Sequence, residues 1–328
     1  MPDHPIKTYR AAVIEALAAE MRSDPRVLII GEDVGAAGGV FLQTEGLFKE
    51  FGAGRVIDTP ISEPGAFGMA VGAAMVGLRP VFEVMFGDFI TLVMDQLVNQ
   101  AAKMHYMSNG RFRVPLVLRT TMGTGSNLGP QHSQSLYAWA AHVPGLKIAI
   151  PATPADAKGL FTAAMRDDNP VLVFEDRLLY GVKGPVPIGD YIVPLGLADV
   201  ARVGDDLTIV TIGRMRTHAL QAAERLQQQG VSVEVIDIRT LVPLDRDTLL
   251  TSLRKTNRVM VVDGAPRSWG ASAEIAAMLS DQGFDWLDAP VTRLAGEDIP
   301  VPMSRSLEPL VQPNAQRIEA AALALVRS

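Results

Sequence analysis

Short apolar runs alternate along the whole chain with stretches in which apolar residues recur at helical spacing. This alternation is typical of parallel sheets whose strands are joined by crossover helices. The predicted strands are 27–30, 80–84, 115–119, 146–150 and 171–175 in the first half, and 207–212, 231–238, 258–262 and 291–294 in the second. The predicted helices are 8–22, 64–78, 88–107, 155–166, 214–229 and 271–281.

A polar passage rich in glycine and proline, 180–194, interrupts this pattern. The 328 residues suffice for two domains of roughly 150 residues each. We therefore expect an α/β protein of two domains, each a mostly parallel sheet flanked by helices. The predicted boundaries are residues 1–185 and 201–328, with a linker at 186–200.

Composition narrows the class of protein. A net charge of −6, without a basic stripe, argues against nucleic acid as a partner. The absence of cysteine excludes disulfides, thiolate metal sites and thiol nucleophiles. The first residues lack the layout of a signal peptide, and no uncharged apolar run reaches the roughly 18 residues that span a bilayer. We expect a soluble, cytoplasmic protein without membrane contact.

One acidic residue, Glu63, precedes an uncharged run of small residues, 64–77, with helical spacing. Gly68 and Gly72 are four apart and so share one helix face. Because each interior glycine costs about 0.5–1 kcal/mol relative to alanine, the pair suggests that another backbone comes close. A carboxylate beside such a contact is poorly hydrated and suited to proton transfer. The alternative is that Glu63 caps the helix and the glycines serve ordinary packing.

Residues at strand ends are further candidates, because ligands of open α/β sheets bind beyond the carboxyl ends of strands. Glu32 follows the first predicted strand, and Phe86 and Phe89 follow the second. An aromatic ring there can stack on a flat cofactor, which contributes about 0.5–1.5 kcal/mol beyond area burial. The alternatives are that Glu32 belongs to a turn or caps a helix, and that the two phenylalanines are ordinary core residues.

The longest polar loop, 120–135, contains His132 among glycines and hydrogen-bonding side chains. It follows an apolar strand, so we expect it at the same sheet edge as Glu32 and Glu63. Imidazole exchanges protons near neutral pH, although many loop histidines are simply solvated. The chain has no Gly-x-Gly-x-x-Gly, Gly-x4-Gly-Lys-Ser/Thr, Gly-x-Ser-x-Gly or His-Glu-x-x-His motif. Simple dehydrogenases, nucleotidases, hydrolases and zinc enzymes are therefore disfavoured.

Over essentially its whole length the chain resembles the beta subunits of the thiamine-diphosphate-dependent decarboxylating component of 2-oxo acid dehydrogenase complexes. The matching segments are 31–34, 58–63, 70–80, 95–96, 131–134, 144–147, 156–160, 166–170 and 287–290. The spacing Glu63-x4-Gly68-Met69-x2-Gly72-Ala73 also resembles a motif of thiamine-diphosphate enzymes in general. The resemblance implies a pyrimidine-binding domain followed by a transketolase C-terminal-like domain.

The resemblance also implies roles for single residues. Glu63 would hydrogen-bond the pyrimidine N1′ of the cofactor and favour its imino tautomer, and His132 would assist acyl transfer to a lipoyl arm. The aminopyrimidine pocket would be lined by Glu32, Ile61, Met85 and Phe89. A structural potassium ion would be held, largely through backbone carbonyls, by Leu116, Ala164, Met165, Asp167 and Asn169. The alternative is that residues 167–170 form a turn that ends a helix.

Related enzymes hold the cofactor diphosphate through Mg²⁺ bound by a Gly-Asp-Gly motif, which this chain lacks. The resemblance therefore implies an alpha subunit that holds Mg²⁺, an α2β2 heterotetramer, and a second subunit against the glycine face. It also implies a lipoyl-bearing acyltransferase core as partner. The expected activity is decarboxylation of a 2-oxo acid, pyruvate first, and transfer of the acyl group to lipoamide. Acetoin and branched-chain 2-oxo acids are alternative substrates, and a catalytically silent assembly subunit is the non-enzymatic alternative.

Overall fold

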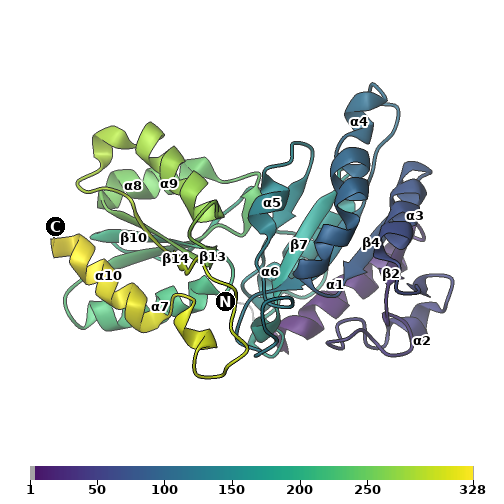
Figure 1. The fold of residues 1–328 in the computed structure, drawn as a ribbon, viewed down its shortest axis with the longest axis horizontal. Helices are drawn as coiled ribbons and strands as arrows, with labels where there is room; N and C mark the ends of the chain where they lie inside the picture. The colour runs from purple at the N-terminus through teal and green to yellow at the C-terminus, as the bar shows by residue number, and fades with distance from the viewer. Residues whose placement is uncertain (1–3, 328) are drawn as a thin grey trace. The chain divides into compact units, whose positions relative to one another are not determined.

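A computed structural model describes residues 4–327 as two compact α/β units (Figure 1). Unit 1 comprises the residues up to Met122 together with Trp139–Leu195, and unit 2 comprises Gly123–Ala138 together with the residues from Gly196 onward. The predicted fold class, two mostly parallel sheets flanked by helices, is confirmed. Within the predicted linker 186–200, Val186 and Val193 are buried in the core of unit 1.

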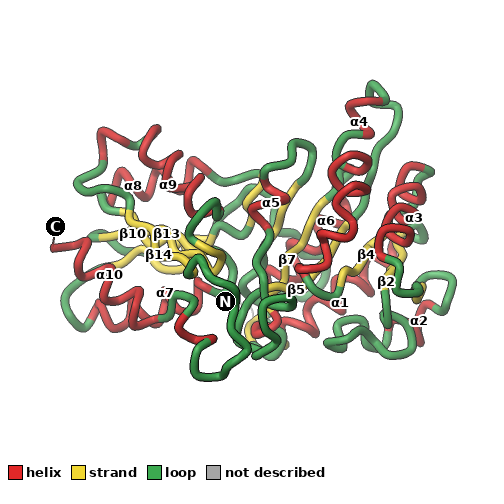
Figure 2. The backbone as a smooth tube through the Cα atoms, viewed as in Figure 1, coloured by secondary structure: helices red, strands yellow, loops and turns green. Residues whose placement is uncertain are grey.

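A parallel sheet forms the centre of unit 1 (Figure 2). Its strands run in the order β6-β7-β5-β4-β2-β3. Their bounds are β2 (Val27–Gly31), β3 (Val56–Asp58), β4 (Arg79–Val84), β5 (Val117–Met122), β6 (Lys147–Ala149) and β7 (Val171–Asp176). Alternate residues pack on opposite faces: Val81 belongs to the core beneath α1 and α6, whereas the ring of Phe82 lies 5.1 Å from that of Phe67 in α3. Both faces are covered, which explains why these strands are continuously apolar.

Among the helices of unit 1, those predicted at 8–22, 64–78 and 155–166 are confirmed, whereas the short helices at 47–51 and 137–141 were not predicted. Their bounds are α1 (Tyr9–Ser23), α2 (Leu47–Phe51), α3 (Glu63–Met75), α4 (Met104–Met107), α5 (Tyr137–Ala141) and α6 (Pro154–Arg166). The predicted continuous helix 88–107 is wrong. A 3₁₀ helix η1 (Gly87–Val93), a π-helical turn η2 (Gln96–Ala101) and α4 replace it. Glycine, aromatic and β-branched residues at the start of this segment have low helix propensity, which favours the tighter 3₁₀ turn of η1. Two short strands, β1 (Ile6–Thr8) and β8 (Lys183–Pro185), pair antiparallel, and η3 is Arg177–Leu179.

Unit 2 has its own sheet, in the order β14-β13-β10-β11-β9, with only β9 antiparallel to its neighbour. The strands of this sheet are β9 (Asp199–Arg202), β10 (Leu207–Thr211), β11 (Val233–Asp237), β13 (Val259–Pro266) and β14 (Thr292–Gly296); the short strand β12 (Thr240–Val242) is not part of it. The helices are α7 (Met215–Gln227), α8 (Arg246–Thr256), α9 (Ala271–Gln282), α10 (Ala315–Arg327), η4 (Phe284–Trp286) and η5 (Glu308–Leu310). Figure 1 shows α8 and α9 on one face of this sheet and α7 and α10 on the other.

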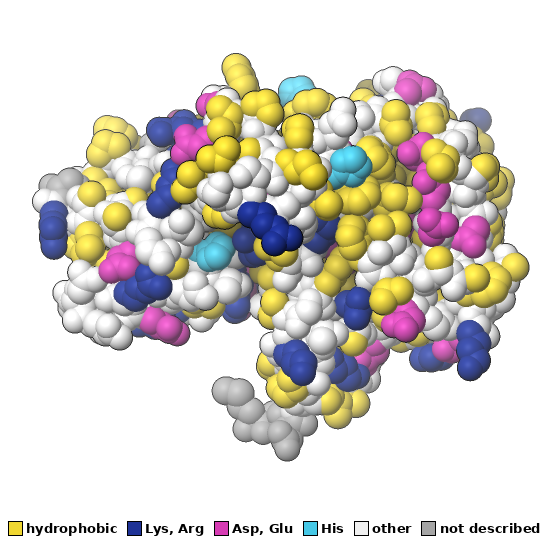
Figure 3. All heavy atoms as spheres, turned by 60° about the horizontal axis from the view of Figure 1, so that its bottom comes forward, with side chains coloured by type: hydrophobic (Ala, Val, Ile, Leu, Met, Phe, Trp, Pro, Cys, Tyr) yellow, Lys and Arg dark blue, Asp and Glu magenta, His cyan; other side chains and the backbone are white. Residues whose placement is uncertain are grey.

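Among the described residues, no helix is long and apolar enough to cross a bilayer. On the face drawn in Figure 3, Lys and Arg side chains are scattered among acidic and apolar ones.

Candidate active site

Three neighbouring strands of unit 1 end at the edge where the predicted cofactor residues lie. β4, β2 and β3 are adjacent and parallel, so their carboxyl ends meet at one edge. Glu32 directly follows β2, Met85 directly follows β4, and Glu63 begins α3 after the short turn that follows β3. Ligands of such sheets bind at this edge. The topology therefore gathers residues that are far apart in the sequence.

Two carboxyl groups, those of Glu63 and Glu32, interact at this edge. Glu63 is half-buried and is the first residue of α3, where the backbone N–H groups of the first helical turn favour a negative charge. Partial burial, together with the neighbouring carboxylates of Glu63 and Asp33, raises the pKa of Glu32. Glu32 can thus retain a proton more readily than an isolated carboxylate.

Aromatic rings cluster just after the end of β4, at the same sheet edge. Phe89, in η1, is half-buried, and its ring centroid lies 5.6 Å from that of Phe86 at an interplanar angle of 70°. Phe86 in turn meets Phe41 edge-on at 5.6 Å. The hydroxyl of Thr121 donates to the Met85 carbonyl at 2.7 Å and so ties the end of β4 to β5.

The last predicted pocket residue, Ile61, is 85% exposed. Glu63, two residues later, is half-buried. The exposure of Ile61 means that this part of the sheet edge is open to solvent. A bound molecule would be enclosed there only if something outside this chain covered it.

The glycines of α3 are not explained by contacts within this chain. Phe67, Ala70, Val71 and Ala74 form the buried face of the helix. A Cβ on Gly68 would lie 3.6 Å from Cγ of Gln96, an ordinary contact, and one on Gly72 would meet no described atom within 4 Å. Met69 on the same helix and Val76, the residue that follows its end, are 51% and 81% exposed. The face that carries Gly72 is therefore open and apolar.

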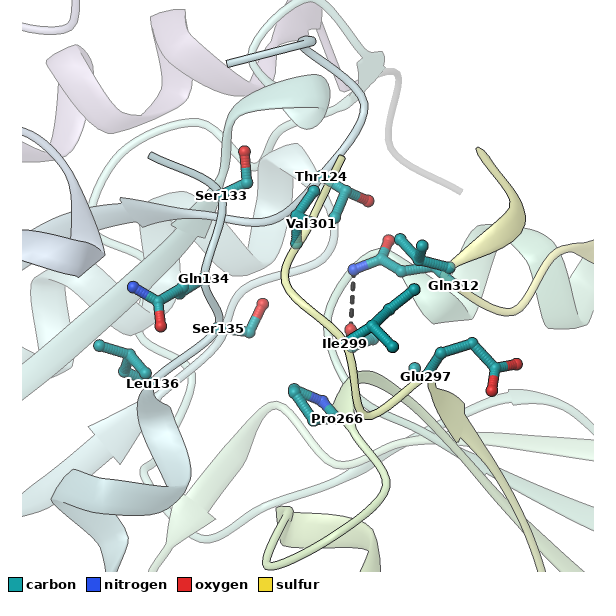
Figure 4. A pocket seen from close by; sticks show the side chains of 13 residues that line it. Thr124, Ser133, Gln134, Ser135, Leu136, Pro266, Glu297, Ile299, Val301 and Gln312 are labelled. Carbon is teal, nitrogen blue, oxygen red and sulfur yellow. Dashed lines mark hydrogen bonds between the residues drawn. The ribbon is translucent and has the colours of Figure 1, made fainter. Parts of the chain in front are cut away.

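His132 lies in the loop between β5 and α5, and the part of this loop from Gly123 onward belongs to unit 2. His132 is half-buried, and its backbone N–H donates to the Gly129 carbonyl at 3.4 Å. Within unit 2 the loop borders a cavity of about 70 Å³ (Figure 4). Figure 4 shows Ser133, Gln134, Ser135 and Leu136 on one side of it and Pro266, Glu297, Ile299 and Gln312 on the other. Ligand pockets usually measure about 300–1,000 Å³, so this cavity suits a few water molecules rather than a substrate.

The residues assigned to potassium lie together at the opposite, amino edge of the sheet. Leu116 precedes β5, Ala164 and Met165 are in the last turn of α6, and Asp167 and Asn169 lie between α6 and β7. Four of these carbonyls already accept a hydrogen bond: Leu116 from Val171 N–H at 2.9 Å, Ala164 from Asp167 N–H at 3.3 Å, and Met165 and Asp167 from the Arg79 guanidinium at 2.9 and 2.6 Å. A carbonyl oxygen has two lone pairs, so each retains one.

A buried charge cluster on β4, β5 and β7 is the main feature that the sequence analysis missed. Arg119, 1% exposed, donates to the Glu175 carboxylate at 2.7 Å, and its other guanidinium nitrogen lies 3.5 Å from Glu83. Glu83 also accepts from the Gln43 amide at 2.6 Å. Burial raises the pKa of Glu83 to about 7; Arg119 opposes the rise and Glu175 adds to it. The available signal was one charged residue within each of the otherwise apolar predicted strands 80–84, 115–119 and 171–175.

Within residues 4–327, no three His, Asp or Glu side chains gather as ligands for a metal ion.

Comparison with protein families matches both units. Residues 6–183 match the transketolase pyrimidine-binding domain, and residues 196–318 match the transketolase C-terminal domain. The chain is similar in fold to a solved structure described as "Split gene transketolase, inactive beta4 tetramer", with a TM-score of 0.81, 23% identity, and coverage of 97% of this chain and 98% of that one.

Three relatives are similar over nearly all of this chain. The beta subunit of acetoin:2,6-dichlorophenolindophenol oxidoreductase from Bacillus subtilis is 46% identical, with 96% of both chains covered. The beta subunit of the pyruvate dehydrogenase E1 component from Rhizobium meliloti is 45% identical, with 95% of this chain and 68% of the relative covered. The 2-oxoisovalerate dehydrogenase subunit beta from Bacillus subtilis is 45% identical, with 96% and 97% covered. Identity does not separate the three substrate classes.

Proposed function

We propose a function from the premise that this chain belongs to the family of 2-oxo acid dehydrogenase beta subunits, which join a transketolase-type pyrimidine-binding domain to a transketolase C-terminal domain. The chain is the beta subunit of a thiamine-diphosphate-dependent enzyme that decarboxylates a 2-oxo acid, pyruvate in the first instance. The acyl group passes to lipoamide carried by a partner acyltransferase.

One observation carries this proposal: the neighbouring carboxyl groups of Glu63 and Glu32 share a sheet edge with the ring of Phe89, and exposed Ile61 lies at the same edge. These residues fit the pyrimidine half of the cofactor, which needs a flat apolar surface and a carboxyl group that exchanges a proton. When bound, thiamine diphosphate supplies the nucleophilic carbon and the electron sink for decarboxylation.

The residues of this chain would orient and protonate the ring. Glu63 would hold a proton at the pyrimidine N1′, and Phe89 would stack on the ring face. Ile61 and Met85 would line the pocket together with Glu32, whose pKa is raised by partial burial and by the neighbouring carboxylates of Glu63 and Asp33. His132 would assist transfer of the acyl group to the lipoyl arm by accepting or donating a proton.

The other half of the site would come from an alpha subunit, in an α2β2 heterotetramer. No Gly-Asp-Gly motif occurs in this chain, so the diphosphate and Mg²⁺ are assigned to the alpha subunit. Exposed Gly72 supports this arrangement, because its missing side chain leaves room for a close backbone that this chain does not supply. The second unit would pair beta subunits and dock the acyltransferase core, as the family resemblance implies.

A potassium ion would occupy the amino-edge cluster of carbonyls. The free lone pairs of Leu116, Ala164, Met165 and Asp167 are the oxygen ligands that a hard cation prefers. The guanidinium of Arg79, bound to two of the same oxygens, opposes a second positive charge there. Because this cluster lies at the sheet edge opposite Glu63, potassium would add stability to this turn rather than take part in catalysis.

Reconstitution with the alpha subunit of the same organism tests the function. The two purified chains, with thiamine diphosphate and Mg²⁺, should reduce an artificial dye in the presence of pyruvate. Acetoin and branched-chain 2-oxo acids, tested in parallel, identify the substrate, because the relatives named for these three substrates are equally similar. Absence of turnover with all of them would support the catalytically silent assembly subunit instead.

A further inference from the structure

The loop that carries His132 has little structure of its own. Residues 123–136 contain no helix or strand. Gly123, Gly125 and Gly129 have φ of +93°, +103° and +75°, and Asn127 has φ of +54°. Asparagine tolerates the left-handed region better than most residues but gains no stability from it. A defined position for His132 therefore depends on contacts from outside the loop.

One carboxylate supplies the first of these contacts. Glu308, in η5 near the end of the chain, is 1% exposed. Its Oε1 accepts from the backbone N–H of Gly125 at 2.7 Å. Its Oε2 accepts from both the backbone N–H and the side-chain amide of Asn127, at 2.9 and 2.6 Å. Three donors from two loop residues thus converge on one buried carboxylate, and hydrogen bonds to a charged acceptor are stronger than neutral ones.

Further contacts within unit 2 hold the two ends of the loop. Arg214 donates to the Thr124 carbonyl at 3.3 Å and to the Gln312 side chain at 2.9 Å, and Gln312 donates to the Gly264 carbonyl at 2.7 Å (Figure 4). After the loop, the Tyr137 hydroxyl donates to the buried carboxylate of Asp263. His132 lies between these ends, five residues after Asn127, which Glu308 binds.

We infer that Glu308 is a positioning residue for His132: its carboxylate fixes the left-handed turn at Gly125–Asn127 and thereby sets where the histidine is presented. This inference rests on the proposed role of His132 in acyl transfer. It predicts that loss of the carboxylate impairs transfer to the lipoyl arm while leaving decarboxylation, which uses Glu63, intact. A role in folding alone would lower both activities by the same factor.

The test compares Glu308→Gln with Glu297→Gln in the assembled complex with the alpha subunit. The control makes the same chemical change in unit 2 at a carboxylate that pairs with Arg317 and not with the loop. Two rates are measured: pyruvate-dependent reduction of an artificial dye, and acylation of a lipoyl domain. Hydrogen exchange of the amides in 123–136 is measured on the same samples and requires no activity.

For Glu308→Gln we expect lipoyl acylation to fall roughly 10- to 100-fold, as for a displaced catalytic group, and dye reduction to stay within about twofold. Exchange at the Gly125 and Asn127 amides should rise about tenfold or more, because each loses a charge-assisted hydrogen bond. Glu297→Gln should change neither. An equal loss of both activities, or unchanged exchange, would overturn the inference.

Asn127→Gly provides a second variant if Glu308→Gln does not assemble. Glycine keeps the left-handed backbone and removes only the side-chain donor, so we expect the same change in the ratio of the two rates, smaller in size. An unchanged ratio would overturn the inference. Failure of the wild-type complex to turn over any 2-oxo acid would refute the proposed function instead, and the exchange result would still decide whether Glu308 holds the loop.

Discussion

Replacing Glu83 by glutamine should remove a pH dependence of stability that arises inside unit 1. Glu83 is buried on β4 and faces Arg119 of β5, which also binds Glu175 of β7; Gln43 donates to its other oxygen. One guanidinium shared by two carboxylates does not offset the removal of both from water. Burial therefore raises the pKa of Glu83 to about 7.

The sign and size of the effect follow from proton linkage. Below pH 4.5 the folded and unfolded chains both hold the proton, and the stabilising contribution is complete. Between 4.5 and about 7 only the folded chain holds it, so stability is lost as the pH rises through 7. At 1.36 kcal/mol per pH unit the whole effect is about 3.4 kcal/mol, of which about 2.5 kcal/mol falls between pH 5 and 8.

Urea unfolding of wild type and Glu83→Gln at pH 5, 6, 7 and 8 measures this contribution. Titrations common to both chains cancel in the difference between their unfolding free energies. Glutamine stays neutral, so this difference should shift in favour of the variant by about 2.5 kcal/mol from pH 5 to pH 8. The infrared difference spectrum should also show a protonated carboxyl group that titrates near pH 7. A pH-independent difference, or titration near 4.5, would refute the reasoning.

Three further changes test other parts of the molecule. Glu63→Gln should assemble with the alpha subunit yet lose about 100-fold or more of the decarboxylation rate, since it cannot exchange the proton; full activity would contradict its assigned role. Gly72→Leu should fold but fail to co-purify with the alpha subunit. The control Gly54→Leu should still assemble, because Gly54 also has open space around it in this chain. Assembly of Gly72→Leu with the alpha subunit would argue against an interface at Gly72. Exchange of potassium for sodium should lower the melting temperature of the wild type by about 2–4 °C, as for a loss of about 1 kcal/mol; equal melting temperatures in both salts would contradict a bound potassium ion.

The sheet and the candidate site were largely predictable because strand signals are local. Continuous apolar runs mark strands buried on both faces, and parallel strands place their carboxyl ends together. This is why Glu32 and Glu63, far apart in the sequence, could be assigned to one edge and interact in the structure. The glycines of α3 suggested a close backbone contact, and the open space at Gly72 shows that no described residue of this chain makes it.

Features that depend on distant partners were not predictable. The segment 88–107 has helical spacing, yet it divides into 3₁₀, π and α turns. Helix α8 was not among the predicted helices, although its N-cap residue Asp245 accepts from the Thr248 N–H. Nothing local indicates that Glu308 binds a loop more than 180 positions earlier in the chain. Burial likewise determines the protonation of Glu83, and burial is a property of the fold.

The central claim is that this chain holds half of an active site that an alpha subunit completes. Calorimetric titration of thiamine diphosphate, in the presence of Mg²⁺, into the isolated chain, the isolated alpha subunit and their complex tests it most directly. The account predicts tight binding to the complex alone, weakened by Glu63→Gln. Equally tight binding to the isolated chain would contradict it.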